Sequence, residues 1–207
     1  MNTQTTAKTA RNNKFIFLLF FIVLIGPIFF AYHLVQKGNA HQLRLTNHGD
    51  LISPPVNMTT TPLHNLTQKQ DLTGKSLHGK WWLVYVGPAK CQQTCHDVIY
   101  NLRQIRTSLG KDASRLERLF IAHPNCEMSV CEKYLSESYP DMMRAQIAQQ
   151  DFENLFHPIS SLSDREMVGE IYIMDPKGNI MMHYAADAPS RDIRSDIKRL
   201  LKVSKIG

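Results

Sequence analysis

The most informative segment of this chain is Lys80-Trp-Trp-Leu-Val-Tyr-Val-Gly-Pro-Ala-Lys-Cys91-Gln-Gln-Thr-Cys95. Its apolar part, Trp81 to Val86, is an unbroken run that is rich in aromatic and β-branched side chains. The length of this run, and the Gly87-Pro88 pair that ends it, favour a buried strand over a helix. The sequence therefore predicts a strand that passes through a short turn into a segment with two cysteines.

The residues after this turn follow a helical period. Apolar side chains recur at the spacing of one face of an amphipathic helix, at Val98, Ile99, Leu102, Ile105 and Leu109. Cys95 starts this face, and Cys91 lies one turn earlier, where the helix is expected to begin. The first turn of a helix presents unpaired N–H groups and the positive end of the helix dipole, which both favour a thiolate.

The spacing of the two cysteines indicates a reactive pair. A separation of four residues brings both sulfurs to one side, close enough to form a disulfide or to share a soft metal ion. Thiolates attack disulfides and also bind Cu(I) and Zn(II). We therefore expect Cys91 and Cys95 to form a redox or soft-metal site. A purely structural disulfide, or two buried thiols, is the alternative.

The remaining segments complete one α/β domain. Residues 71–207 are numerous enough for one domain with one core. Strands are expected at 116–122, 143–147, 170–174 and 179–184, and helices at 149–156 and, capped by Ser190, near the end of the chain. The Pro and Gly of Asp175-Pro-Lys-Gly178 favour a tight turn between the last two strands. The order strand, helix, strand, helix, hairpin, helix is that of a thioredoxin-like domain, with helices flanking a central mixed sheet.

The N-terminal part predicts a membrane anchor. Residues 1–14 carry three basic and no acidic side chains, and residues 15–35 carry no charge at all. At 1.5 Å per residue, residues 15–35 cover about 30 Å, the thickness of a bilayer core. The apolar run is too long for a cleaved signal peptide and ends in aromatic residues suited to a membrane interface. The basic head favours a cytoplasmic N-terminus, which places the C-terminal domain in the periplasm, outside a cell inner membrane that the chain crosses once.

Residues 36–70 are expected to be a tether between the anchor and the domain of residues 71–207. Pro54-Pro55 and the Thr59 to Pro62 stretch resist regular structure, and the apolar residues of this segment show no period. The formal net charge of +6 is spread thinly, without a run of like charges. This distribution argues against binding of nucleic acid.

These motifs together resemble the Sco/SenC family of thioredoxin-fold proteins, which help to build the copper centre of cytochrome c oxidase. The resemblance covers most of residues 70–207 and is carried by Gly79 to Tyr85, by the Cys-x-x-x-Cys spacing and by Ile171 to Gly178. Further short stretches are similar to membrane-anchored thioredoxin-like proteins found beside oxidase genes in proteobacteria: Asn47 to Leu51, Val86 to Ala89 and Leu102 to Arg106. The resemblance implies a role in oxidase assembly, with the copper-bearing oxidase subunit or another assembly factor as partner.

One position departs from the Sco pattern. Sco proteins bind copper with the two cysteines and a histidine about five residues before the Tyr of a Tyr-x-x-Asp-Pro strand. Counting back from Tyr172 reaches Met167. Because a thioether suits Cu(I), Cys91, Cys95 and Met167 form the candidate ligand set for copper, and no other cofactor is expected. Met167 as a core or rim residue, with no third ligand, is the alternative.

A second cysteine pair, Cys126 and Cys131, follows the strand expected at 116–122. Four cysteines allow three pairings, of which a small structural bridge between Cys126 and Cys131 is the simplest. A relay that passes oxidation from this pair to Cys91 and Cys95 is the alternative. His96 follows Cys95 directly and points to another side of the helix, so it is expected at the surface.

Three functions are compatible with the sequence. The first is a thiol–disulfide oxidoreductase, acting as a reductase during copper-site maturation, and the missing family histidine favours it. The second is a Cu(I)-binding metallochaperone of the Sco type, which the three-residue spacing between the cysteines favours. The third is a redox-inert scaffold for oxidase assembly. All three follow from the family resemblance rather than from composition or periodicity.

Overall fold

The computed structural model of the chain describes residues 5–36, 46–87, 91–124, 128–160 and 169–206, and it forms two compact units, Met1–Thr46 and Asn47–Gly207. The first unit contains the helix α1 (Thr5–Gln36). Its segment Ile16–His33 has a mean hydropathy of 2.4 and no buried residue. By length and composition this one helix can cross a membrane, and it overlaps the anchor expected at 15–35.

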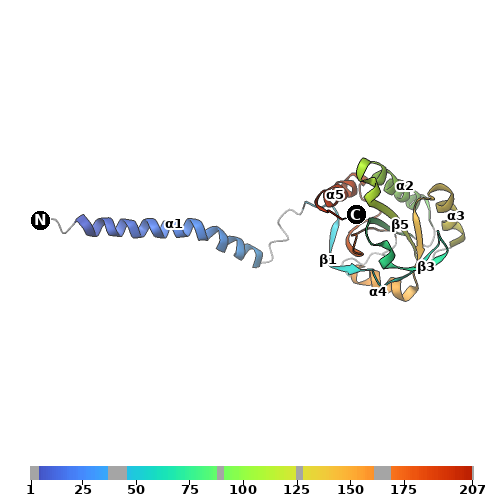
Figure 1. The fold of residues 1–207 in the computed structure, drawn as a ribbon, viewed down its shortest axis with the longest axis horizontal. Helices are drawn as coiled ribbons and strands as arrows, with labels where there is room; N and C mark the ends of the chain where they lie inside the picture. The colour runs from blue at the N-terminus through green and yellow to red at the C-terminus, as the bar shows by residue number, and fades with distance from the viewer. Residues whose placement is uncertain (1–4, 37–45, 88–90, 125–127, 161–168, 207) are drawn as a thin grey trace. The chain divides into compact units, whose positions relative to one another are not determined.

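The second unit is built on a mixed sheet to which the described residues contribute eight strands, in the order β1-β8-β7-β4-β5-β6-β2-β3 (Figure 1). The strands β4, β5 and β6 are parallel to one another, and all other neighbours are antiparallel. The thioredoxin-like α/β fold expected from the sequence is therefore confirmed. The strands are β1 (Asp50–Asn57), β2 (Pro62–Asn65), β3 (Gln70–Thr73), β4 (Trp81–Gly87), β5 (Leu116–Ala122), β6 (Met143–Gln146), β7 (Ile171–Met174) and β8 (Asn179–Tyr184).

Helices cover both faces of this sheet. The helices α2 (Gln93–Thr107) and α5 (Ser190–Val203) lie on one face, and α4 (Gln149–Ser160) lies on the other (Figure 1). A further helix, α3 (Met128–Ser138), and the short 3-10 helices η2 (Gly74–Leu77) and η3 (Gly110–Arg115) complete the described elements. The strands and both hydrophobic clusters lie within residues 47–207, so this unit contains a complete core of its own.

The strand β4 lies at the centre of the core because both of its faces are covered. All seven of its residues are buried. Trp81, Leu83 and Tyr85 pack in the cluster under α2 and α5, whereas Trp82 and Val84 pack in the cluster under α4. A strand buried on both faces reads as a continuous apolar run instead of an alternating one, which is the pattern that predicted it.

The elements expected from strong periodicity are close to those observed. The strand at 116–122 has the bounds expected for it, and the hairpin closes through a bond from Gly178 N–H to Asp175 O at 3.0 Å. The helix expected at 149–156 continues to Ser160. Ser190 does not cap the last helix, because Pro189 is the N-cap residue and Ser190 is the first helical residue. The helix α3 was not among the expected elements, although Met128, Cys131 and Leu135 follow at the helical steps of three and four.

The stretch expected as a tether at 36–70 instead holds β1, β2 and the first residue of β3. The strand β1 is an edge strand that pairs only with β8, and its register shifts between Leu51 and Val56. Pro54 and Pro55 lie within this shift. A proline cannot donate a ladder hydrogen bond, but an edge strand tolerates it. Because of these prolines, and because its apolar residues show no regular period, β1 could not be predicted from the sequence.

The start of the second unit is fixed to α5 by a buried carboxylate. Asp196 is 2% exposed and accepts hydrogen bonds from His48 N–H at 2.7 Å and Gly49 N–H at 3.1 Å. The hydroxyl of Tyr184 donates to the same oxygen at 2.8 Å, and His48 Nδ1 lies 3.0 Å from the other oxygen. Burial alone raises the pKa of Asp196, but these hydrogen bonds outweigh it and hold the pKa below its ordinary value.

A candidate dithiol site at the start of helix α2

Cys91 and Cys95 lie between the end of β4 and the first turn of α2. The strand ends at Gly87 and the helix begins at Gln93, so Cys91 precedes the helix by two residues and Cys95 belongs to its first turn. The two residues are joined by a disulfide, and their Cα atoms are 5.2 Å apart. The structure therefore brings the two predicted sulfurs together beside the central sheet.

Close packing shapes the strand end that leads to this site. A Cβ added at Gly87 would lie 2.1 Å from Cζ of Phe120, so only glycine fits here without displacing the aromatic ring. The backbone of Val86 is bonded to the segment before β7, through Gly169 N–H to Val86 O at 2.9 Å and Val86 N–H to Glu170 O at 3.2 Å. The end of β4 is thus fixed on two sides, which gives the following turn a defined starting point.

The two cysteines differ in exposure. Cys95 is 2% exposed and packs in the core with Val98 and Ile99, whereas Cys91 is only partly buried at the margin of the same cluster. In a reduced pair, Cys91 is the sulfur that another molecule reaches first. Cys95 is placed to react with whatever Cys91 has bound. This asymmetry suits a dithiol that exchanges with an external disulfide.

The helix start can stabilise a thiolate. Gln92 is the N-cap residue and makes no capping bond through its side chain, and no acidic residue lies in the first turn. The first backbone bond in this region runs from His96 N–H to Gln92 O at 3.1 Å. The unpaired N–H groups and the positive end of the helix dipole lie at this end of α2, and both favour a thiolate over a thiol in the reduced pair.

An aromatic cluster connects this helix start to α3. The ring of His96 stacks on Tyr134, with centroids 3.9 Å apart and planes inclined by 20°. Tyr134 in turn contacts Tyr139 edge-on, and Arg103 lies over the Tyr139 ring at 5.8 Å. Burial, followed by a hydrogen bond with Tyr139, raises the pKa of Tyr134 to about 12. Sequence reasoning missed this cluster, because it gave no signal for α3 and thus no partner for His96.

Other predicted site residues lie outside what the structure describes. Met167 and Cys126 fall in segments that are not described, and only the backbone of Cys131 is described, as part of α3. Their roles therefore stay predictions. The described residues contain no group of three or more His, Cys, Asp or Glu side chains placed to hold a metal ion. Reduction of the Cys91–Cys95 disulfide would leave two thiolates, which are ligands suited to Cu(I).

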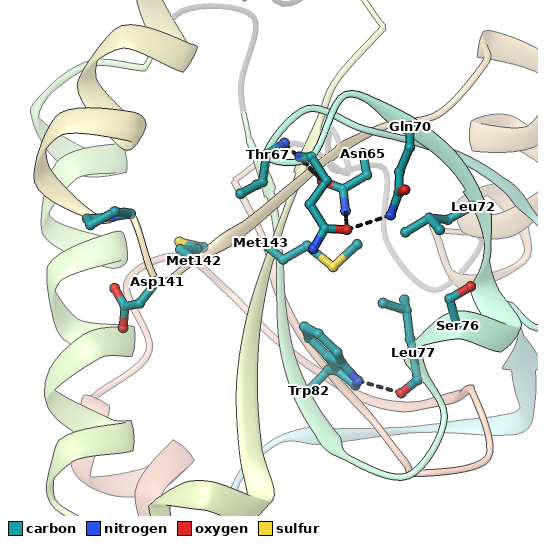
Figure 2. Close-up of a pocket in the computed structure, with 12 residues that line it drawn as sticks. Asn65, Thr67, Gln70, Leu72, Ser76, Leu77, Trp82, Asp141, Met142 and Met143 are labelled. Carbon is teal, nitrogen blue, oxygen red and sulfur yellow. Dashed lines mark hydrogen bonds between the residues drawn. The ribbon is translucent and has the colours of Figure 1, made fainter.

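A cavity of about 420 Å³ lies elsewhere in the domain, between the β2–β3 hairpin, η2 and the start of β6 (Figure 2). Its polar side chains bind one another: Gln68 Oε1 accepts from Asn65 and Gln70, at 3.3 and 2.6 Å. Trp82 Nε1 donates to Leu77 O at 2.7 Å. The residues that line the cavity include no cysteine or histidine, so it offers no thiol or imidazole chemistry.

Comparisons with known proteins agree with this geometry. A family model described as a transmembrane-like, thioredoxin-like, C-terminal domain matches residues 81–204. No curated protein matches the chain closely in sequence. Among solved structures, the Sco protein of Arabidopsis thaliana with copper bound has 16% sequence identity and a TM-score of 0.57, and the match covers 75% of this chain and 99% of that one.

Two further Sco structures are similar in the same way. The copper-bound Sco protein of yeast has 21% identity and a TM-score of 0.56, over 75% of this chain and 93% of that one. BsSco, described as a Sco-family cytochrome c oxidase assembly protein with a disulfide switch, has 16% identity and a TM-score of 0.56, over 75% of this chain and 98% of that one. At these identities the likeness shows the fold.

The family model covers well over half of the chain, including β4, the two cysteines and α5. The resemblance to Sco/SenC proteins noted in the sequence is therefore confirmed at the level of fold. The chain belongs to the transmembrane-like, thioredoxin-like family, with residues 81–204 as the C-terminal domain that defines it.

Proposed function

We propose that this protein is a membrane-anchored thiol–disulfide reductase that acts in the maturation of the copper site of cytochrome c oxidase. The observation that carries the proposal is the Cys91–Cys95 disulfide at the start of α2, with one sulfur at the margin of the core and the other inside it. A structural bridge does not require this asymmetry, whereas a dithiol that reacts in sequence does.

The reaction follows from the positions of the two sulfurs. The Cys91 thiolate attacks a disulfide of the partner, which breaks that disulfide and forms a mixed disulfide between the two proteins. Cys95 then loses its proton and displaces the partner's sulfur from Cys91. The partner leaves as a dithiol with the two electrons, and the chain is left with the Cys91–Cys95 disulfide seen in the structure.

The proposed partner is the copper-bearing subunit of the oxidase, whose cysteines must be reduced before they bind copper, or another assembly factor. The support is the fold shared with BsSco, described as a member of a family of cytochrome c oxidase assembly proteins. We also propose that residues 1–14 lie in the cytoplasm, that 15–35 cross the cell inner membrane once and that the C-terminal domain is periplasmic. The apolar segment Ile16–His33 supports this arrangement.

A second candidate function is Cu(I) transfer by the same two cysteines, with Met167 as a third ligand. It is favoured by the fold shared with two Sco proteins that were crystallised with copper bound. In this case copper is the cargo, held by the reduced Cys91 and Cys95, and the disulfide is the form that cannot bind it.

One set of measurements on the reduced full chain in detergent separates the two functions. Reduction of a small disulfide is followed by stopped flow, and Cu(I) affinity is titrated without oxygen against a chelator. The reductase proposal expects that Cys91→Ser abolishes the reaction, and that Cys95→Ser accumulates a mixed disulfide on Cys91. The matched control, Cys126→Ser with Cys131→Ser, should leave both steps unchanged.

The outcomes are distinct. Tight one-to-one Cu(I) binding that is lost in Met167→Ala would replace the reductase by the metallochaperone. Negligible Cu(I) binding together with rapid reduction of the disulfide supports the reductase. Unchanged oxidase assembly in cells that carry the Cys91→Ser, Cys95→Ser double variant would exclude both functions and leave only a scaffold.

A further inference from the structure

The outward side of α5 carries a stripe of basic side chains. Arg191, Ser195, Lys198 and Lys202 follow at steps of four, three and four, so these three basic residues and the serine between them share one side of the helix. Arg191, Lys198 and Lys202 are exposed on this side. Of the two acidic residues of α5, Asp196 is buried against His48, whereas Asp192 lies beside the N-terminal end of the stripe, 3.4 Å from Nε of Arg191. The positive charge of the stripe is therefore concentrated at its C-terminal half, at Lys198 and Lys202.

A hollow beside this stripe brings further positive charge to the same surface. Its volume is about 460 Å³, and it is lined by Lys111 of η3 together with Lys198 and Lys202 of α5. Its one acidic lining residue, Asp112, has Arg115 3.7 Å away. Three ammonium groups around one open hollow fit a phosphate group, which binds lysine as a point charge.

Apolar side chains are exposed at the C-terminal end of the stripe. Val203 is 78% and Ile206 52% exposed, and outside α1 they are two of the four large apolar side chains that the described residues expose. They are held in place by Arg115, which donates to Leu201 O and Ser204 O at 2.9 Å and to Ile206 O at 3.0 Å. Basic side chains next to fixed, exposed apolar ones are typical of a surface that meets a membrane interface.

The length of chain between α1 and the domain limits how far the domain can lie from the anchor. The helix α1 ends at Gln36, and the domain begins at Asn47. The residues between them, 37 to 46, can span at most about 35 Å. His48 and Gly49 are bonded to Asp196 of α5, so the segment that comes from the anchor reaches the domain at this helix. The helix itself is about 21 Å long.

We propose that α5 and η3 bind the anionic headgroups of the bilayer that holds α1, an inference that rests on the proposed anchor. The membrane-facing surface consists of Lys111, Arg191, Lys198 and Lys202, with Val203 and Ile206 at its end. The basic side chains pair with lipid phosphates and the apolar ones enter the interface. Salt weakens the binding, because the attraction falls off within a Debye length.

The first test uses residues 47–207, which contain the whole sheet and both hydrophobic clusters. Cosedimentation with phosphatidylglycerol-containing vesicles should be strong at low salt, weak at about 0.5 M NaCl and absent with phosphatidylcholine alone. Arg191→Glu, Lys198→Glu and Lys202→Glu together should lower the partition coefficient at least about 100-fold, since each lost basic residue is expected to contribute about fivefold.

A control variant of equal net charge separates this surface from general attraction. Lys69→Glu, Lys75→Glu and Lys177→Glu change three exposed lysines on other elements and should change the partition coefficient by less than about threefold. An equal loss in both triple variants, or equal binding to neutral vesicles, would overturn the proposal. Both variants should reduce a small disulfide as fast as the unchanged chain, so a failure here is distinct from failure of the dithiol function.

The second test uses the full chain in proteoliposomes. The variant Val203→Trp places a fluorophore at the membrane-facing surface, and phospholipids brominated near the start of their acyl chains quench it on contact. Quenching above that of the parent chain, whose Trp81 and Trp82 are buried, is expected in anionic proteoliposomes. No extra quenching there would contradict the proposal. Retention of the chain in the membrane after alkaline carbonate treatment tests the anchor separately.

Discussion

The central strand β4 and the edge strand β1 are held in the same sheet by different interactions. All residues of β4 are buried, and the strand pairs with β5 on one side and β7 on the other. The edge strand β1 pairs only with β8 and buries a single side chain, Ile52. Its position is fixed just before it begins, by the bonds of His48 and Gly49 to Asp196.

Because of this difference, the stability of the domain depends little on pH around β4 and more strongly on pH at the start of β1. Packing of apolar side chains around β4 changes little with pH, because β4 itself carries no carboxyl, amino or imidazole group. The contacts that fix the start of β1 depend on the carboxylate of Asp196, which accepts stronger bonds from N–H donors when it is charged than when it is neutral. The dithiol therefore follows β4, the strand whose packing is insensitive to pH. The segment from the anchor joins the domain at β1, whose contacts are sensitive to pH.

The largest loss of stability is expected when the packing around the central strand β4 is disturbed. Leu83 is fully buried in β4, and Leu83→Ala removes its contacts with the cluster under α2 and α5. The free energy of unfolding should fall by about 3 kcal/mol, because a cavity remains that the packed sheet cannot close. Urea unfolding followed by far-UV circular dichroism on residues 47–207 measures it. A loss below about 1 kcal/mol would show that β4 is less central than its burial indicates.

A smaller loss is expected at the junction before β1. Asp196→Ala leaves the N–H groups of His48 and Gly49 and the hydroxyl of Tyr184 without their acceptor. The free energy of unfolding should fall by about 2 kcal/mol, as is typical of lost hydrogen bonds to a charged group. Asp196→Asn is the matched control, since its amide oxygen can still accept these bonds. It should lower the free energy of unfolding by only about 1 kcal/mol. Equal losses in both variants would show that charge matters more than the acceptor.

The junction should also make the domain sensitive to acid. The pKa of Asp196 is lower in the folded chain than in the unfolded one, so its contribution is full above about pH 4 and is lost as the pH falls through the folded pKa. The stability difference between the unchanged chain and Asp196→Asn should shrink from about 1 kcal/mol at pH 6 towards zero near pH 2. Asp141, whose pKa is also lowered, mainly by Arg118 against the effect of burial, is present in both chains and cancels. A constant difference across this range would contradict the assignment.

The smallest effect is expected at the opposite edge. Leu72 lies on β3, which pairs only with β2, and its side chain is partly exposed. Leu72→Ala should lower the free energy of unfolding by about 0.5 kcal/mol, since little apolar surface leaves water there. The same urea experiment that measures Leu83→Ala provides the comparison. A loss as large as that of Leu83→Ala would remove the distinction between centre and edge.

The same distinction explains how much of the fold could be predicted. The run from Trp81 to Val86 predicts β4, because a strand that is buried on both faces has an apolar residue at every position. In β1, Pro54 and Pro55 interrupt the pattern, and the interactions that fix its start come from Asp196, far along the chain. Contacts between residues so distant in sequence leave no local period from which to infer them.

The two cysteines of the candidate site could be predicted from the sequence, but the aromatic residues that pack beside them could not. Cys91 and Cys95 combine a strand end, a helix start and a four-residue spacing, and all three are local signals. Tyr134 joins the site through its stacking on His96, from a helix that was not among the expected elements. Nothing close to His96 in sequence indicates that an aromatic ring from another helix covers it.

The bonds of His48 and Gly49 to Asp196 also decide where a mechanical pull on the chain would act. Tension applied through residue 46 would reach α5 before it reached the first pair of β1, Asp50 with His183. The inner side of α5 is packed into the core through Ile193, Ile197 and Leu201. A stretched linker would therefore first have to break the bonds of His48 and Gly49 to a helix that stays anchored in the core, and only then could it peel β1 away from β8 pair by pair.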